Sequence, residues 1–411
     1  QYLQGLTLGG NVSDQACLEV GSGSLLEFGE HRPLILGSGN WRCVVTVKVR
    51  GGLLRFVGPQ GSFQTGGHEA VFLTDTGEDR SPQVNIVVTD GGSIETDRVL
   101  AANPVTHRVD GGDFVSGVFL TLDGGTYKAG AGFGVSPQTP NANTRKSRNA
   151  LFCAVDRNNV DYPAAALDYT AEILVTVGPK GGTFDISDAQ AGVTSVTNAI
   201  VGAPVPSDSI PGGFVPTLGP RWTLDGCLNV KGRGGQEFVV NGLDAAALKR
   251  LRVDGATLKV VSDCAAALEE LTLGAPAGGL LVESADSGAS RQDVSIASLS
   301  VGEGGIFDAT MFDPAHTLVQ DMSFSPNSTL CVRGNPARAF SVSGTLTLPS
   351  ALSYLVPPKT QTAATVLTAG NVAAPEGGVV WTQLPTTRTR RFRIGRKAIE
   401  MMGYGMTVTV R

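Results

Sequence analysis

The side chains with the clearest chemical potential are carboxylates that precede glycine pairs. Asp90, Asp110 and Asp123 each stand directly before Gly-Gly. An aspartate in that position can accept hydrogen bonds from the amides of its own turn. Calcium is the second interpretation, because stacked turns would gather carboxylate and carbonyl oxygens into one cage. The carboxylates that would ligate calcium are Asp75, Glu78, Asp79, Asp110 and Asp113.

Patterns that indicate catalysis are scarce in this chain. It has four histidines, without acidic or nucleophilic neighbours at motif spacing: His31, His68, His107 and His316. Asp156 and Asp161 are the nearest candidates for the paired carboxylates of a polysaccharide lyase or hydrolase, although they also suit loop caps. We therefore expect a non-enzymatic protein without a cofactor. A carbohydrate-active enzyme remains the alternative.

Six cysteines occur without a C-x-x-C pair, so the spacing of a zinc site is missing. An even number of cysteines in an exported chain favours disulfides. We expect Cys17 to pair with Cys43, and Cys227 with Cys264. The alternative is six buried thiols.

Charge is unequal at the two ends of the chain. The first 31 residues contain no Lys or Arg and have four acids, Asp14, Glu19, Glu27 and Glu30. The last 24 residues contain a single acid, Glu400, and seven basic residues: Arg388, Arg390, Arg391, Arg393, Arg396, Lys397 and Arg411. A basic edge strand discourages aggregation, and nucleic acid is disfavoured as a partner by the overall charge of −5. The third interpretation is that the acidic end of one copy binds the basic end of the next.

The elements that position these residues follow a spacing that recurs along the chain. Two apolar residues flank one other residue, a glycine-bearing turn follows, and the pattern repeats, as in Leu271–Leu273 and Leu280–Val282. Period-two alternation predicts a strand with one buried face. Such short strands need stacked copies, which predicts an all-β parallel β-helix with loop insertions and a C-terminal capping segment. Its stacked core is predicted to include Leu271, Leu273, Leu299, Val301, Met322 and Phe324.

A leucine-rich repeat is the competing fold. Leu248-x-x-Leu251-x-Val253 and Leu268-x-x-Leu271-x-Leu273 match the strand core of such a repeat. The asparagine position of that repeat is missing, however, and the glycine turns lead to a second strand rather than to a helix. We therefore favour the β-helix.

Composition suggests four regions. An N-terminal solenoid half with long loops is expected over 1–203, and a proline-rich loop or linker over 204–220. A C-terminal solenoid half is expected over 221–385, and basic capping or assembly strands over 386–411.

The C-terminal region resembles the passenger regions of autotransporter-like secreted proteins. The matching stretches are Phe340–Pro349, Ala364–Gly370, Trp381 and Met406–Arg411. The resemblance implies a right-handed parallel β-helix with closed last rungs, outside the cell or on its surface, and a role in adhesion, matrix or fibre formation. The chain lacks the large membrane β-barrel of that family, so self-export is not expected.

Together these observations predict a secreted structural protein that polymerises end to end with copies of itself. A glycan-binding adhesin is the first alternative, using loop aromatics such as Trp41 or Tyr162. No apolar run approaches the ~18 residues that span a bilayer, so we expect no membrane span.

Overall fold

The computed structural model describes about half of the N-terminal part of the chain and most of the C-terminal part. The described residues are 2–3, 6–8, 15–28, 34–36, 44–56, 63–65, 83–96, 99–100, 105–109, 112–129, 152–153, 173–187, 195–198, 215–216, 222–241, 243–284, 290–332, 339–356, 364–385 and 390–402. Within these ranges the regular elements are strands, apart from the short 3-10 turns η5 (Ala245–Ala247) and η6 (Ala309–Met311).

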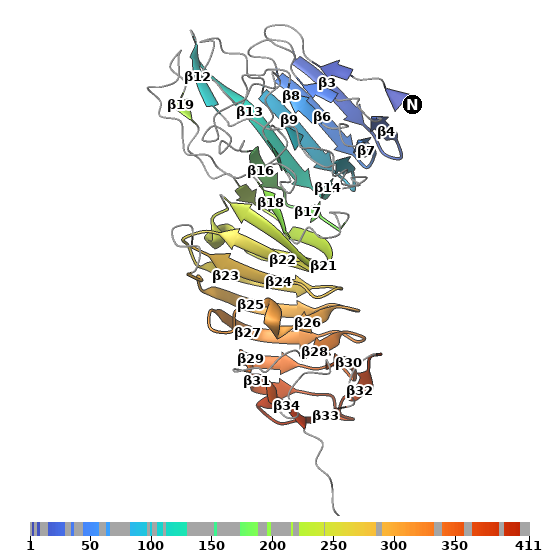
Figure 1. The fold of residues 1–411 in the computed structure, drawn as a ribbon, viewed down its shortest axis with the longest axis vertical. Coiled ribbons are helices and arrows are strands. Elements are labelled where there is room, and N and C mark those ends of the chain that lie inside the picture. The colour runs from blue at the N-terminus through green and yellow to red at the C-terminus, as the bar shows by residue number, and fades with distance from the viewer. Residues whose placement is uncertain are drawn as a thin grey trace, which may run out of the picture. The chain divides into compact units, whose positions relative to one another are not determined.

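The chain forms two compact units. The first comprises Gln1–Gly232 with Gln236–Asp244, and the second comprises Arg233–Gly235 with Ala245–Arg411. Of the predicted linker 204–220, only 215–216 lies among the described residues. Each unit is a stack of parallel strands (Figure 1).

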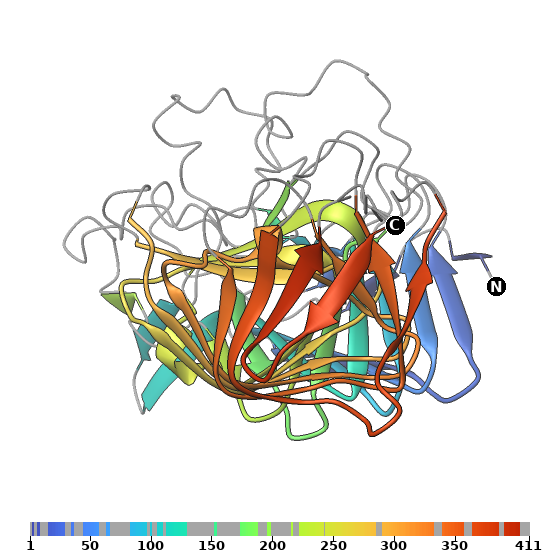
Figure 2. The same cartoon turned by 90° about the horizontal axis from the view of Figure 1, so that it is seen from below.

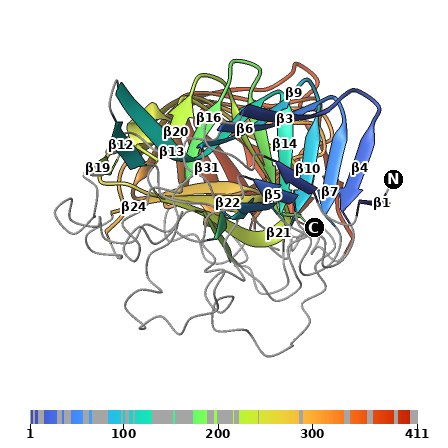
Figure 3. The same ribbon diagram turned by 90° about the horizontal axis from the view of Figure 1, so that it is seen from above.

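The described strands of unit 1 form three faces, and the first coils contribute one strand to each face in turn. The first face contains β1 (Tyr2–Leu3), β4 (Leu25–Phe28), β7 (Leu53–Phe56), β10 (Ser93–Thr96), β14 (Gly125–Ala129), β17 (Gly182–Asp185) and β21 (Leu228–Asn241). The second contains β2 (Leu6–Leu8), β5 (Leu34–Leu36) and β8 (Phe63–Thr65). The third contains β3 (Gln15–Val20), β6 (Val44–Arg50), β9 (Gln83–Thr89), β13 (Gly112–Asp123), β16 (Ile173–Val177) and β20 (Trp222–Leu224). Figure 3 shows the first and third faces as separate rows of strands.

Unit 1 also contains several smaller strand pairings. β11 (Val99–Leu100) pairs in parallel with β15 (Phe152–Cys153), and β18 (Ser195–Asn198) with β21. β12 (Val105–Val109) lies antiparallel between β13 and β19 (Val215–Pro216).

The coils of unit 1 stack in register, so equivalent side chains fall in columns. On the first face the inward column runs from Leu54 through Ile94 and Tyr127 to Phe184. All four side chains are 0 % exposed. Their alternation with outward residues is the period-two pattern of the sequence, and the buried column is the core it predicts.

Glycines in the turns between the third and first faces allow this close stacking. Gly91 has a φ of +79°, a left-handed conformation that favours glycine. Its neighbour Gly92 lies against the coil before it, because a Cβ there would come within 2.4 Å of the carbonyl oxygen of Val49. The two glycines therefore serve different purposes, one conformational and one steric.

Unit 2 has two stacks of parallel strands. The longer strands are β22 (Arg250–Val261), β23 (Ala266–Leu273), β25 (Val294–Val301), β27 (Thr317–Phe324), β29 (Phe340–Thr347) and β31 (Ala364–Ala373). β22 also pairs with β24 (Gly279–Glu283), and a second sheet contains β26 (Ile306–Asp308), β28 (Thr329–Cys331), β30 (Ala351–Leu355) and β32 (Val380–Gln383). Seen along the stack in Figure 2, these strands lie over one another around a shared interior.

The longer strands explain the leucine spacing that suggested a leucine-rich repeat. β23, β25 and β27 share one burial pattern, in which the first, third, sixth and eighth residues are buried and the fourth and fifth are both exposed. Two consecutive outward residues mean that the strand bends, so Leu268 and Leu271 both face the core. The described residues contain no α-helix, and the leucine-rich repeat is therefore excluded there. The parallel β-solenoid is confirmed.

The predicted core of unit 2 is also confirmed. Leu271, Leu273, Leu299 and Val301 are each 0 % exposed. Met322 and Phe324 are 2 % and 5 % exposed.

The parallel stack of unit 2 ends in an antiparallel hairpin of β33 (Arg391–Ile394) and β34 (Ala398–Met402). β34 pairs antiparallel with β31. It occupies the edge of β31 that a further parallel coil would need. The hairpin is therefore a cap, which we call the C-terminal cap (residues 390–402).

Candidate functional site at the C-terminal cap

The C-terminal cap presents cations on one side and apolar side chains on the other. In β33, Arg391 and Arg393 are exposed, whereas Phe392 and Ile394 are half-buried. Arg396 and Lys397 form the exposed turn of the hairpin. These four cations form no ion pair with another described residue. We call Arg391, Arg393, Arg396 and Lys397 the basic patch.

The hairpin is held in place by backbone and aromatic contacts. The carbonyl oxygens of Arg396 and Lys397 accept hydrogen bonds of 2.8 Å from backbone amides of β31. The ring of Phe392 stacks on Trp381 of β32 with centroids 4.4 Å apart, and lies 5.1 Å from the ring of Tyr354. This aromatic cluster joins β30, β32 and β33, and so fixes the direction in which the arginines of β33 point.

Two of the predicted assembly residues are not in the basic patch. Arg390 is only 6 % exposed, and its backbone amide donates to the Tyr354 hydroxyl at 3.3 Å. Its guanidinium is thus enclosed by the protein rather than offered at the surface. Arg388 lies outside the described residues.

Strand edges are open next to the basic patch. Among the described strands, the register pairs β32 only with β30, and β33 only with β34. β32 is also poorly covered, since its first residue, Val380, is 66 % exposed. An uncovered edge presents backbone donors and acceptors that another strand can use.

The acids predicted for the opening coil are not gathered in the same way. Glu19 on β3 lies 3.8 Å from Arg50, and Glu27 on β4 lies 3.5 Å from Arg55. Glu27 is not on the outermost strand, because β1 covers β4. Asp14 and Glu30 lie outside the described residues.

Glu27 instead begins a column of charges on the first face of unit 1. Arg55 lies 3.5 Å from Glu27 and 2.7 Å from Glu95, which in turn lies 4.0 Å from Lys128. The hydrogen bond to Glu95 raises the pKa of Arg55 despite the opposing effect of burial. We call this column, with Asp185 and Lys231 that follow it in register, the charge ladder.

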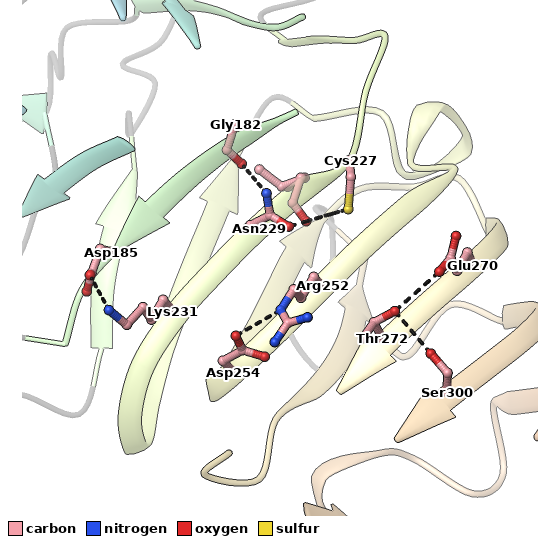
Figure 4. A network of polar contacts seen from close by, with 11 residues as sticks. Gly182, Asp185, Cys227, Asn229, Lys231, Arg252, Asp254, Glu270, Thr272 and Ser300 are labelled. Atoms are coloured by element: carbon pink, nitrogen blue, oxygen red, sulfur yellow. Dashed lines mark hydrogen bonds and ion pairs between the residues drawn. The ribbon is translucent and has the colours of Figure 1, made fainter. Parts of the chain in front are cut away.

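Asp185 is the most buried acid of the ladder. Its side chain is 6 % exposed and accepts from Lys231 Nζ at 3.0 Å, as Figure 4 shows. Burial raises the pKa of Asp185, but hydrogen bonds from Ser187 and Lys231 outweigh it and leave the pKa below its ordinary value. The carboxylate therefore stays ionised although it is enclosed.

Sequence reasoning missed most of the ladder, although a signal was present. Every member except Lys231 lies four residues after a turn glycine with a positive φ, as Arg55 follows Gly51 and Glu95 follows Gly91. Alignment of the turns would have placed these charges in one column.

The aspartates of the glycine turns are held by a lysine. Lys180 Nζ lies 2.5 Å from Asp90, and its backbone amide donates to Asp123 at 2.8 Å. The hydrogen bond with Lys180 lowers the pKa of Asp90 and raises that of the lysine. These two turns thus use their carboxylates within the protein.

The other calcium candidates have no described side chains. Asp75, Glu78, Asp79 and Asp110 lie outside the described residues, and of Asp113 only the backbone, in β13, is described. Across the described ranges, no group of three or more His, Cys, Asp or Glu side chains is placed to hold a metal ion.

Neither predicted disulfide is present among the cysteines that the structure describes. Cys17 carries an exposed free thiol and lies opposite Thr46 in the register of β3 and β6, while Cys43 is outside the described residues. No disulfide joins Cys227 to Cys264. The Cys227 thiol is directed to the side-chain oxygen of Asn229, at the start of β21, at 3.5 Å (Figure 4).

The residues proposed for the alternative functions are mostly beyond the described ranges. Trp41, Tyr162, Asp156 and Asp161 lie outside them. His316 is described, with its Nδ1 2.9 Å from Asp293 at the surface of unit 2.

Comparison with known proteins finds no matching family model, no matching curated protein and no matching solved structure. Within the described part of the chain, no helix has the length and apolar character needed to cross a membrane.

Proposed function

We propose that this chain is a non-enzymatic, extracellular structural protein whose copies associate end to end into a fibre or matrix. The observation that carries the proposal is the basic patch on β33 and the hairpin turn that follows it, next to the open edge of β33. Four exposed cations without an ion-pair partner among the described residues, beside two strands paired on one side only, form a surface suited to an acidic strand edge.

The partner that fits this surface is the opening coil of a second copy. β1 and β3 begin their faces and, among the described strands, pair only with β4 and β6. Glu19 of β3 is exposed, and its 3.8 Å contact with exposed Arg50 is of a kind that contributes little to stability. A contact between unlike ends is heterologous, and it extends into a filament unless its rotation closes a ring.

A structural role also accounts for how the acidic side chains are used. Asp90 and Asp123 bind Lys180 of a later coil, and Asp185 binds Lys231. These carboxylates stabilise the stacking of coils. The extracellular location rests on the resemblance of the C-terminal region to secreted passenger regions.

The test is the size of the purified full-length protein as a function of salt. Sedimentation velocity and negative-stain electron microscopy should detect elongated oligomers at low ionic strength that shorten as NaCl is raised, because salt screens exposed charges. The double variant Arg391→Glu with Arg393→Glu should remain monomeric. Its matched control, Arg391→Lys with Arg393→Lys, keeps the charge and should assemble.

Two results would contradict the proposal. One is a wild-type protein that stays monomeric at every salt concentration and protein concentration tested. The other is assembly of the glutamate variant to the same extent as the lysine variant, since the basic patch would then have no part in the contact.

A further inference from the structure

The charge ladder alternates in sign from coil to coil. From the first described charge to the last, it reads Glu27, Arg55, Glu95, Lys128, Asp185 and Lys231, and each is the register partner of the next. Four of the five steps are ion pairs between neighbouring coils. Coils that are neighbours in the stack therefore carry opposite charges here, and coils two apart carry like charges.

The buried side chains of the first face differ in size, but every coil presents a hydrophobic one at the same position. Leu54, Ile94, Tyr127 and Phe184 all point inward at the same position and are fully buried. Each coil also enters this face through a glycine turn that bonds to the next turn. A nascent strand could therefore stack on a coil that is not its neighbour in sequence and still bury its apolar side chain.

Such an error would place like charges side by side. If β7 were left out of the stack, Glu27 would face Glu95, and if β10 were left out, Arg55 would face Lys128. Strands of one sheet lie about 4.8 Å apart, and like charges directly opposite each other in a sheet are destabilising. The ladder side chains are partly enclosed, with Glu27 and Glu95 only 19 % and 17 % exposed, so water screens that repulsion incompletely.

We infer that the charge ladder sets the order in which the coils of unit 1 stack, by rejecting any coil that is one place out of sequence. The apolar columns make stacking favourable, and the alternating charges select the neighbour. This role is independent of the proposed end-to-end assembly, because the ladder and the basic patch share no residue.

Two variants with unchanged net charge separate this role from the individual ion pairs. The exchanged variant, Arg55→Glu with Glu95→Arg, keeps composition but reads acid, acid, base, base from residue 27 to residue 128. The inverted variant changes all six signs, with Glu27→Lys, Arg55→Glu, Glu95→Lys, Lys128→Glu, Asp185→Lys and Lys231→Glu, and so keeps the alternation along the whole ladder. Each is denatured in urea and diluted into buffer with low salt or with 1 M NaCl.

The readout is the yield of monomer with wild-type amide-exchange protection in β7, β10 and β14. The inverted variant should refold like the wild type. The exchanged variant should lose about five-fold or more of its native yield at low salt, and recover most of it in 1 M NaCl. Equal yields for the two variants would overturn the inference. So would a loss by the inverted variant as large as that of the exchanged one, since the particular contacts and not their alternation would then matter.

Discussion

Substitution of Gly92 by alanine tests the reason for glycine in the stacked turns. An added Cβ would lie 2.4 Å from the carbonyl oxygen of Val49 in the coil before it, whereas ordinary contacts begin at 3.4 Å. The two coils would have to separate by about 1 Å at a point where backbone hydrogen bonds join them, which we expect to cost about 3 kcal/mol. For a unit of this size that loss corresponds to a fall in Tm of roughly 6–12 °C.

Two matched glycines isolate this steric effect from backbone strain. Gly91 has a φ of +79° and open space where a Cβ would stand, so Gly91→Ala should cost only about 1–2 kcal/mol, the strain of a left-handed alanine. At Gly21 a Cβ would also have nothing within 4 Å and φ is not in the left-handed region. Gly21→Ala should therefore change stability by less than about 0.5 kcal/mol.

Urea unfolding followed by Trp fluorescence gives the stability of each variant, and amide exchange shows whether the loss is centred on β6, β7 and β10. The expected order of destabilisation is Gly92→Ala, then Gly91→Ala, then Gly21→Ala. If Gly92→Ala were no more destabilising than Gly91→Ala, close contact between coils would not be what selects glycine at this position.

Three further results are expected. Phe184→Ala should cost about 3–5 kcal/mol in urea unfolding, because its ring is 0 % exposed, whereas Leu25→Ala, at a 52 % exposed side chain, should stay within about 0.5 kcal/mol; equal effects would contradict the assigned core. The depressed pKa of Asp185 means that its ionised form stabilises unit 1 above the unfolded pKa of about 3.9, and that this is lost as pH falls through the lower folded-state pKa. The stability difference between wild type and Asp185→Asn should accordingly be largest near pH 7 and vanish in strong acid. A difference that grows in acid would refute a stabilising role for the ionised carboxylate. In the native protein a maleimide should label exposed Cys17 rapidly and should label Cys331, which is 2 % exposed, only after unfolding; rapid labelling of both would be inconsistent with this burial.

The sequence is a good guide to what each residue does within its own strand. Alternation identified Leu271, Leu299 and Met322 as core positions, and paired glycines identified the turns. These are local properties, because side-chain direction in a strand depends only on position parity. The parallel solenoid followed from them, since strands this short must stack to bury their apolar face.

Properties that depend on which strands are neighbours were not accessible in the same way. Cys17 was expected to reach Cys43, yet the register places it opposite Thr46. Arg390 reads as one more exposed base, yet it is buried where the hairpin folds over Tyr354.

The class of fold, the inward positions and the turns follow from the amino-acid sequence, because period and glycine content act over a few residues. The alignment of Glu27, Arg55 and Glu95 in one column depends on how the coils pair in the folded protein. Coils of unequal length separate these residues by 28 and 40 positions, so no fixed period marks them. The inter-strand hydrogen bonds that align the coils are made after each loop has closed, and loop length does not fix their register.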